Sequence, residues 1–486
     1  MSKVSDATVL PSLLERQSSG GDIGEGGINF QADVVLSYIP KWLSIEGFTS
    51  MLREGMVDAE AMFFVPGHGY KREAVEVKDN VVIPSKFWAE VDRFREIDVA
   101  SPGDYPWFRF AAAGLSKELH PIINGLRRIS EPYAFYEGSP LMENSFDEYS
   151  RRVREAGRSD EDAEFLFKRV LIDGNLSTIR DHGFAIFQHS LQLHLPHYQD
   201  VPPSLVKDIY SDLATFVRGR RNTPISRMEL EKVLRNRVPN HFLPPVNRLR
   251  IHTAIEDLEP ATDQSAVRFR WTRFFKPGSD GYPPPDRWNT DVIGELQETK
   301  DWILKHRDTR RIVLSGNRRL SASLAIGSVF SAVAGFSIEM IYREGAVCAT
   351  DAHADATTAP YPLTAEEPRQ LMKADRLAVS VSIIHNIGRE VDSSLKEWGR
   401  TDASILHIRG EQPIISPQQA NLAVRGIKTL ICDALAKTGA RQLDLFFAGP
   451  AFLALFLGHR LNATMWVQCH ERIAPGRYVP TCLLFA

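Results

Sequence analysis

Cysteine, long apolar runs and net charge are all scarce in this 486-residue sequence. Its four cysteines lie in the last third without C-x-x-C spacing, so neither a disulfide framework nor a structural zinc site is expected. No run reaches about 18 apolar residues and the N-terminus lacks a signal-type apolar core, so we expect a cytoplasmic protein outside the membrane. A net charge of −3 excludes a wholly basic surface and leaves room for a local basic channel.

The overall composition is that of a soluble globular protein. Hydrophobic residues make up 43% of the sequence and charged residues 24%, which is enough apolar material for full cores. At about 100–200 residues for each domain, the length predicts two to four domains.

A β-hairpin near residue 70 is the feature that carries chemistry. Residues 59–65 and 70–78 read as two short strands, and the Pro-Gly-His-Gly segment at 66–69 is a plausible turn. Side chains alternate along a strand, so Glu76 and Lys78 share one face, which we expect to be exposed.

The register of this hairpin decides whether a third polar group joins them. A symmetric four-residue loop pairs Val65 with Tyr70 and sets Asp58 opposite Val77, on the wrong face. A bulge or a one-residue slip is therefore needed to bring Asp58 beside Glu76.

With that slip the pattern becomes Asp…Glu-x-Lys. Two carboxylates, Asp58 and Glu76, can hold a divalent cation, and Lys78 can orient a water or stabilise charge at a phosphate. The other interpretation is a surface hairpin with a solvated Glu–Lys pair. Gln31, at the start of a helix predicted from Phe30, is either a capping group or part of the same site.

Composition divides the chain into four parts. Residues up to 27 are polar and rich in serine and glycine, and the helix from Phe30 is expected to be interrupted near Pro40. The order strand, strand, helix, strand, helix then predicts an α/β core, and the prolines at 239–245 mark the best boundary. The predicted parts are a flexible N-terminus at 1–27, a nuclease-like core at 28–138, a helical extension at 139–240 and a C-terminal domain at 241–486.

The C-terminal domain contains a loose duplication. A strand at 311–314, the loop 315–319, a helix and a strand are followed about 130 residues later by a strand, the loop 448–450, a helix and a strand. Such βαβ units form parallel sheets that bind nucleotides at the carboxyl ends of the strands. Neither loop has a G-x-G-x-x-G or P-loop pattern, so no dinucleotide cofactor or ATPase is implied.

These segments resemble a known family. The stretches SGNRRLSASLAIGSVF and LDLFFAGPAFLALFLGHRLN, with the late Tyr478-Val479-Pro480, resemble the SAVED domain, a fusion of two CARF-like Rossmann units that senses cyclic oligonucleotides. The Gly-rich lead to Phe30-Gln31, followed by the Asp…Glu-x-Lys pattern, resembles the PD-(D/E)xK nuclease domain of the DUF4297 type found in CBASS anti-phage effectors. The implied fold class is α/β, with a restriction-endonuclease-like core and two fused CARF-like units.

The resemblance implies a double-stranded DNA endonuclease that needs Mg²⁺ and is activated by a cyclic di- or trinucleotide. Ligand binding to the SAVED domain would drive self-association and release cleavage. Asp58 and Glu76 would be catalytic and hold the metal, Lys78 would be catalytic, and Glu54 is a possible additional ligand.

The same resemblance implies where the cyclic oligonucleotide binds. Trp271 and Trp288 either stack on a base or belong to the core, and His385, Arg409 and Gln412 are further possible contacts. The positions best placed to meet phosphates and bases are Ser315, Gly316, Asn317, Arg318, Arg319, Ala448, Gly449, Pro450 and Phe452.

Two other functions fit the same residues. One is a non-catalytic cyclic-nucleotide receptor whose N-terminal domain only docks DNA or a partner. The other is a modification-dependent restriction endonuclease, in which the C-terminal half reads a DNA base and no soluble messenger acts. The paired βαβ plan without a basic stripe favours the messenger over the DNA base.

Overall fold

The computed structural model describes residues 25–243, 247–255, 265–274, 283–341, 347–355, 357–367, 371–400, 403–461 and 465–485, so the predicted flexible segment 1–27 lies almost wholly outside them. The chain forms two compact units, Met1–Pro245 and Val246–Ala486, and each is described by itself. The fold class is mixed α/β, as predicted, and the described residues form three sheets.

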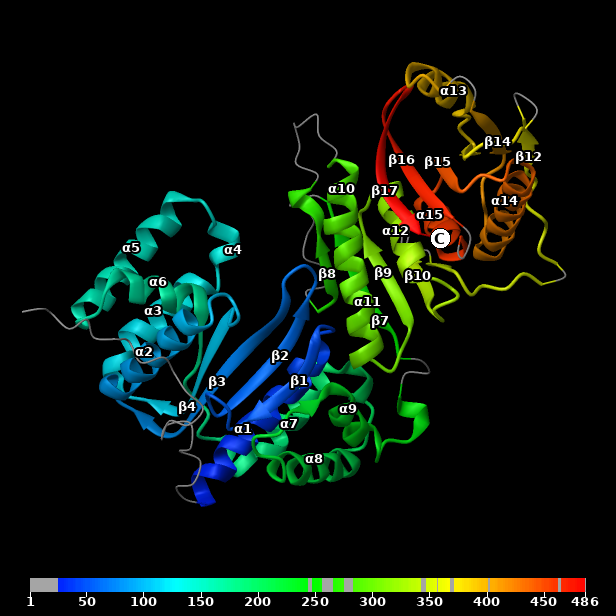
Figure 1. Cartoon of the computed structure of the whole chain (residues 1–486). Helices are drawn as coiled ribbons and strands as arrows, with labels where there is room; N and C mark the ends of the chain where they lie inside the picture. Colours follow the sequence, from blue (N-terminus) through cyan, green and yellow to red (C-terminus); the bar gives the residue numbers. More distant parts are fainter. Residues whose placement is uncertain are drawn as a thin grey trace, which may run out of the picture. The chain divides into compact units, whose positions relative to one another are not determined.

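Unit 1 is a six-stranded sheet of order β5-β4-β3-β2-β1-β6 with helices on both faces (Figure 1). Strands β1 to β3 are antiparallel, and β3, β4 and β5 are parallel. The elements are α1 Glu25–Ser44, β1 Phe48–Arg53, β2 Ala59–Val65, β3 Gly69–Val82, α2 Pro84–Ala100, β4 Trp107–Leu115, α3 His120–Ser130, α4 Tyr133–Tyr136, α5 Pro140–Glu155, α6 Asp160–Arg169, β5 Val170–Asp173, α7 Ile179–His194, α8 Pro203–Arg218, β6 Ile225–Ser226 and α9 Arg227–Arg235.

Alternation along β3 divides its side chains between two cores. Val75 and Val77 pack in the cluster that α1, α7 and α8 cover, whereas Ala74 packs in the cluster beneath α2. The prediction of an exposed face was therefore wrong, because β3 is a central strand with helices on both sides, and Glu76 is only 9% exposed.

Two further expectations for unit 1 were wrong. Helix α1 continues through Pro40 to Ser44 instead of breaking there. The segment 139–240, predicted as a separate helical extension, belongs to unit 1: its strands β5 and β6 form the two edges of the sheet, and α7 to α9 complete the core over α1. Strands of four and two residues are too short to leave an alternating pattern in the sequence.

Unit 2 contains two sheets, of orders β11-β10-β9-β7-β8 and β12-β14-β13-β15-β16-β17. Both are parallel at the centre; in the first sheet only the edge strand β11 is antiparallel, whereas in the second both edge strands, β12 and β17, are antiparallel. The elements are β7 Leu249–Ala254, β8 Val267–Arg270, α10 Pro285–Arg287, α11 Gly294–His306, β9 Arg311–Gly316, α12 Leu320–Val329, β10 Ser337–Ile341, β11 Val347–Ala349, β12 Thr364–Glu366, β13 Arg376–Ile383, α13 Gly388–Glu397, β14 Ser404–Gly410, α14 Pro417–Thr438, β15 Gln442–Ala448, α15 Ala451–Arg460, β16 Trp466–Ala474 and β17 Arg477–Phe485.

Each sheet has a point where the direction of winding reverses. In the first sheet the chain runs from β9 through α12 to β10 on one side, while β8 adjoins β7 on the other, so the reversal lies between β7 and β9. In the second, α13 leads from β13 to β14 and α15 leads from β15 to β16 in the opposite direction, so it lies between β13 and β15. Ligands of open α/β sheets bind at the carboxyl ends of the strands at such switch points.

Helices α12 and α15, which follow the two duplicated strands, lie side by side and cross at a pair of glycines (Figure 1). A Cβ at Gly327 would lie 2.1 Å from the carbonyl oxygen of Leu455, and a Cβ at Gly458 would lie 2.1 Å from that of Leu324. The two contacts are reciprocal: each glycine faces a backbone carbonyl of the other helix. The backbones of α12 and α15 are therefore in direct contact at these positions, with no room for a side chain between them.

We expect Gly458→Ala to destabilise unit 2 by about 2 kcal/mol, because an added methyl group in a filled contact forces the helices apart. Urea unfolding followed by circular dichroism measures the loss. Gly294→Ala is the matched control, since the nearest atom to a Cβ there is 3.9 Å away. Equal unfolding midpoints for Gly458→Ala and wild type would contradict the close contact.

Candidate functional site

The structure contains the hairpin with the one-residue slip that the site needs. Val65 pairs with Gly69 and Ala59 pairs with Val75, so the loop has three residues and the next position along sets Asp58 opposite Glu76. Gly67 and Gly69 have φ values of 70° and 66°, a conformation that glycine adopts without strain and that closes the shorter loop. The symmetric four-residue register is therefore not the one adopted.

The three polar groups of the motif converge. One carboxylate oxygen of Asp58 accepts a hydrogen bond from the backbone N–H of Val77 at 2.7 Å, which fixes it against β3. The Lys78 ammonium donates to Glu76 Oε1 at 2.7 Å. Asp58 at the start of β2 and the Glu-x-Lys pair on β3 thus form one cluster, as their predicted roles require.

Helix α2 adds a carboxylate that the sequence reading did not single out. Glu90 Oε1 lies 2.7 Å from Lys78 Nζ, so the ammonium bridges two acids. A signal was present: Glu90 stands three residues after Phe87 and four before Phe94, on the face that packs on the sheet. A charged residue on such a face usually has a partner below it.

Helix α1 contributes a further residue, Gln31, to the cluster. The side-chain amide of Gln31 donates to the second carboxylate oxygen of Asp58 at 3.0 Å. Of the two predictions for Gln31, the structure favours a lining residue of the site over a surface cap. Asp58 is thus held by one hydrogen bond at each oxygen.

Burial and electrostatic interactions shift the pKa values of the ionisable groups in this cluster. Burial, together with the neighbouring Glu76 carboxylate, raises the pKa of Asp58 well above its usual value. Burial also raises the pKa of Glu76, against the pull of Lys78. Burial alone would lower the pKa of Lys78, but Glu76 and Glu90 raise it, so the ammonium stays protonated at any physiological pH.

These residues fit a divalent cation. Two buried carboxylates repel each other, and a cation between them would relieve the repulsion and the desolvation of both. Across the described ranges, no group of three or more His, Cys, Asp or Glu side chains is arranged as a metal site. Mg²⁺ needs fewer protein ligands, because it commonly takes one or two carboxylates and completes its shell with water and phosphate oxygens. Asp58 and Glu76 would hold it.

Glu54 does not join the cluster. Its carboxylate lies 3.4 Å from the Arg221 guanidinium and 3.6 Å from that of Arg53, and its backbone N–H donates to the carbonyl of Asp58. The prediction of Glu54 as an additional metal ligand was wrong, because its side chain is engaged by two arginines. Its backbone, with φ at 57°, instead shapes the turn that presents Asp58.

In unit 2, the loop after β9 lies at the first switch point. Ser315 Oγ lies 3.0 Å from the Nδ1 atom of His252 on β7. Arg318 folds back, donating to Thr253 Oγ1 at 2.9 Å and to the carbonyl oxygens of Ser315 and Gly316, each at 3.1 Å. The Arg318 side chain therefore stabilises the conformation of the loop, whereas the side chains of its neighbours Asn317 and Arg319 are exposed.

Gly316 is required in this loop. It has φ at 83°, and a Cβ there would lie 2.0 Å from the carbonyl oxygen of Thr253. Any side chain would push β9 away from β7 at the carboxyl ends of both strands.

Three aromatic residues predicted as ligand contacts or possible contacts are core residues. Trp271 and Trp288 are each 0% exposed, and Trp271 Nε1 donates to Glu295 at 3.0 Å. Phe452 is buried against Phe456 of the same helix. Stacking by these side chains on a base is ruled out, because the apolar core already covers their faces.

The second predicted loop, Ala448-Gly449-Pro450, follows β15 at the second switch point and is partly buried. Of the lower-ranked candidates, Arg409 pairs with Glu366 at 2.8 Å, and His385 and Gln412 are exposed in the loops that follow β13 and β14. These loops lie at the carboxyl ends of neighbouring parallel strands.

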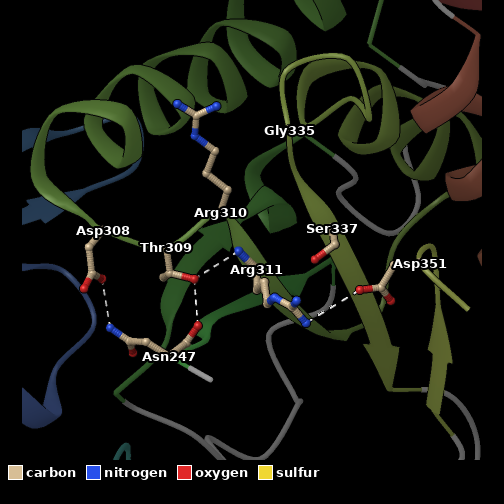
Figure 2. A pocket seen from close by; sticks show the side chains of 8 residues that line it. All are labelled: Asn247, Asp308, Thr309, Arg310, Arg311, Gly335, Ser337 and Asp351. Atoms are coloured by element: carbon tan, nitrogen blue, oxygen red, sulfur yellow. Dashed lines mark hydrogen bonds and ion pairs between the residues drawn. The ribbon is translucent and has the colours of Figure 1, made fainter. Parts of the chain in front are cut away.

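A separate cavity of about 480 Å³ opens at the amino ends of β9 and β10, the opposite end from the predicted ligand loops (Figure 2). Two arginines and two aspartates line it, and each has a partner: Asp308 accepts from Asn247 at 3.0 Å, Arg310 donates to the carbonyl of Ala334, and Arg311 lies 3.7 Å from Asp351. The cavity therefore carries no excess charge that would favour a phosphate.

No helix in the described residues has the length and apolar character needed to cross a membrane.

Comparison with known proteins supplies the deciding observation. Residues 295–484 match the family described as the SMODS-associated and fused to various effectors sensor domain. This part of unit 2 is similar to a SAVED domain. Along its whole length, the chain is similar to the CD-NTase-associated protein 4 of an Acinetobacter species, with 25% identity over 97% of this chain and 99% of the relative. The corresponding protein of Moraxella osloensis is 24% identical, over 97% and 99%.

Solved structures share the fold of both units. The Acinetobacter baumannii Cap4 SAVED/CARF-domain containing receptor, in complex with the cyclic trinucleotide 3′3′3′-cAAA, has a TM-score of 0.82 at 22% identity, covering 96% of this chain and all of that one. The Moraxella osloensis Cap4 receptor has a TM-score of 0.78 at 20% identity, covering 95% and 100%. This similarity supports the prediction of fused CARF-like units in unit 2.

Proposed function

We propose that the protein is an Mg²⁺-dependent endonuclease that cleaves double-stranded DNA in CBASS anti-phage defence and is activated by a cyclic oligonucleotide. The observation that carries the proposal is the coexistence of the Asp58–Glu76–Lys78 cluster in unit 1 with a SAVED domain in unit 2. The Cap4 structure bound to a cyclic trinucleotide supports a ligand of that class.

Each residue of the cluster has a task in phosphodiester hydrolysis. When bound, Mg²⁺ would polarise the scissile phosphate and lower the pKa of the attacking water. Asp58, oriented by Gln31 and by the Val77 N–H, and Glu76 would hold the ion. Lys78 is a permanent cation because of its two acidic neighbours, so it would stabilise the negative charge that develops on the phosphate and would not act as a base.

Activation would follow from ligand binding to unit 2. The switch-point loops after β9 and β15 would contact the cyclic oligonucleotide, with Asn317 and Arg319 exposed for its phosphates. We propose that the bound state favours self-association, which brings nuclease units together.

A thermal-shift screen of the full chain against cyclic di- and trinucleotides tests the sensor function. A ligand at about 100 times its Kd stabilises the folded state by about 2.7 kcal/mol, so one member of the panel should clearly raise the melting temperature. The linear oligonucleotide of the same bases is the control for the ligand. A panel without a single stabilising member would contradict the sensor function.

A further inference from the structure

Ile384, the residue after β13, has a backbone conformation that isoleucine rarely adopts. Its φ is 72°, in the left-handed region where a β-branched side chain is strained. Two hydrogen bonds fix it there: Ile384 N donates to the carbonyl of Gly410 at 2.7 Å, and His385 N donates to that of Ile383 at 2.9 Å. The chain therefore turns within three residues, held by the neighbouring strand.

The strained residue is also exposed. Ile384 is 64% exposed, whereas Ile383 and Ile387 on either side are 3% and 0% exposed. The chain is pinned again where Ile387 N donates to the buried hydroxyl of Ser382 at 3.2 Å. The strained backbone reduces the stability of the fold, and residues strained in this way cluster at ligand-binding sites.

Its position is the second switch point. Ser382 is in register with Ala448, so the end of β13 lies beside the loop that follows β15. Gly449 lets that loop approach: a Cβ there would lie 3.1 Å from Cβ of Ile383. Ile384 thus follows the carboxyl end of β13, the strand that forms one side of the second switch point, where the topology expects a ligand.

The two switch points differ in chemistry. The first has hydroxyl, imidazole and guanidinium groups, from Thr253, Ser315, His252 and Arg318. The second adds an exposed aliphatic side chain, that of Ile384, beside the polar side chains of His385 and Asn386. A cyclic oligonucleotide presents both kinds of surface, since its phosphates and riboses are polar and the faces of its bases are apolar.

We propose that Ile384 is a platform on which the face of one nucleobase of the cyclic oligonucleotide packs, and that its left-handed backbone holds the platform out for that contact. The inference rests on the proposed function, because it assumes that the SAVED domain binds such a ligand. It adds a binding residue and assigns the apolar part of the ligand to the second switch point.

The test combines two measurements on full-length Ile384→Gly and Ile384→Leu. The probe is the cyclic di- or trinucleotide that gives the wild type its largest thermal shift, and its Kd is measured by calorimetry. Glycine removes the platform and relieves the strain, so Ile384→Gly should bind at least tenfold more weakly while its melting temperature without ligand stays equal or rises. Ile384→Leu keeps an aliphatic surface and should bind within about threefold of wild type.

Val333→Gly is the matched control, because Val333 is a 74% exposed aliphatic residue in a turn of the same unit, and its loss should leave the Kd unchanged. Wild-type affinity in Ile384→Gly would overturn the platform while leaving the sensor function intact. Weaker binding together with a lower melting temperature without ligand would overturn it as well, since Ile384 would then support the fold. Failure of the whole panel to bind wild type would remove the proposed function and the platform together.

Discussion

Lys78→Ala should reduce DNA cleavage by the messenger-saturated full chain at least a hundredfold, because a fixed cation that faces the developing phosphate charge is lost. Supercoiled plasmid with Mg²⁺, followed over time on agarose gels, measures the rate. Lys71→Ala is the matched control: Lys71 lies on the same strand, β3, is partly exposed, and donates to the carbonyl oxygen of Gly103.

Glu76→Gln separates chemistry from folding at the same site. The amide keeps the shape of the carboxylate but is a poor ligand for Mg²⁺, so cleavage should fall as far as in Lys78→Ala. Because burial raises the folded-state pKa of Glu76, its ionised form costs stability above that pKa, and the neutral amide should not lower the melting temperature. Wild-type cleavage rates in both variants would contradict the assignment of the site.

Arg109→Ala should destabilise unit 1 by about 3–5 kcal/mol, the range expected when one partner of a buried ion pair is removed. Arg109 on β4 donates to Glu73 on β3 at 2.6 Å and to Asp173 on β5 at 2.8 Å, so it ties three parallel strands together. Glu73, which is buried and also accepts a hydrogen bond from Trp42 Nε1, would lose its cationic partner.

Hydrogen–deuterium exchange of the β3 and β4 amides gives a local measure of that loss, since these amides should exchange at least a hundredfold faster. Arg151→Ala is the matched control: it removes an ion pair with Glu155 in which the two side chains are 54% and 62% exposed, and such pairs contribute at most about 1 kcal/mol. Similar exchange rates in the two variants would show that the ion pairs of Arg109 do not stabilise the sheet.

The nuclease-like hairpin shows how far sequence reasoning reaches. Strand alternation correctly grouped Glu76 with Lys78, and the chemistry correctly required a slip to recruit Asp58. The slip itself depends on Gly69 entering the strand with a positive φ, a choice that the sequence left open. Glu90 was missed because helix α2 reaches the site from a later part of the chain, and Glu54 was misassigned because it pairs with Arg221, which is distant in the sequence.

In unit 2, too, some features could be predicted from the sequence and others could not. The duplicated strand–loop–helix–strand pattern predicted β9–α12–β10 and β15–α15–β16 closely. The sequence could not decide whether Trp271 and Trp288 are buried in the core or stack on a base, because tryptophan suits both roles. Only the packing in the folded structure shows that both are core residues. The strain at Ile384 was invisible, since no residue type there favours a left-handed backbone.

The central claim is that occupancy of unit 2 controls cleavage in unit 1. The direct measurement is the initial rate of plasmid cleavage by the full chain in Mg²⁺ as a function of messenger concentration, beside a binding isotherm for the same messenger. We predict essentially no cleavage without messenger and a rise whose midpoint follows the binding midpoint. Cleavage at the full rate without messenger, or saturated binding without cleavage, would contradict it.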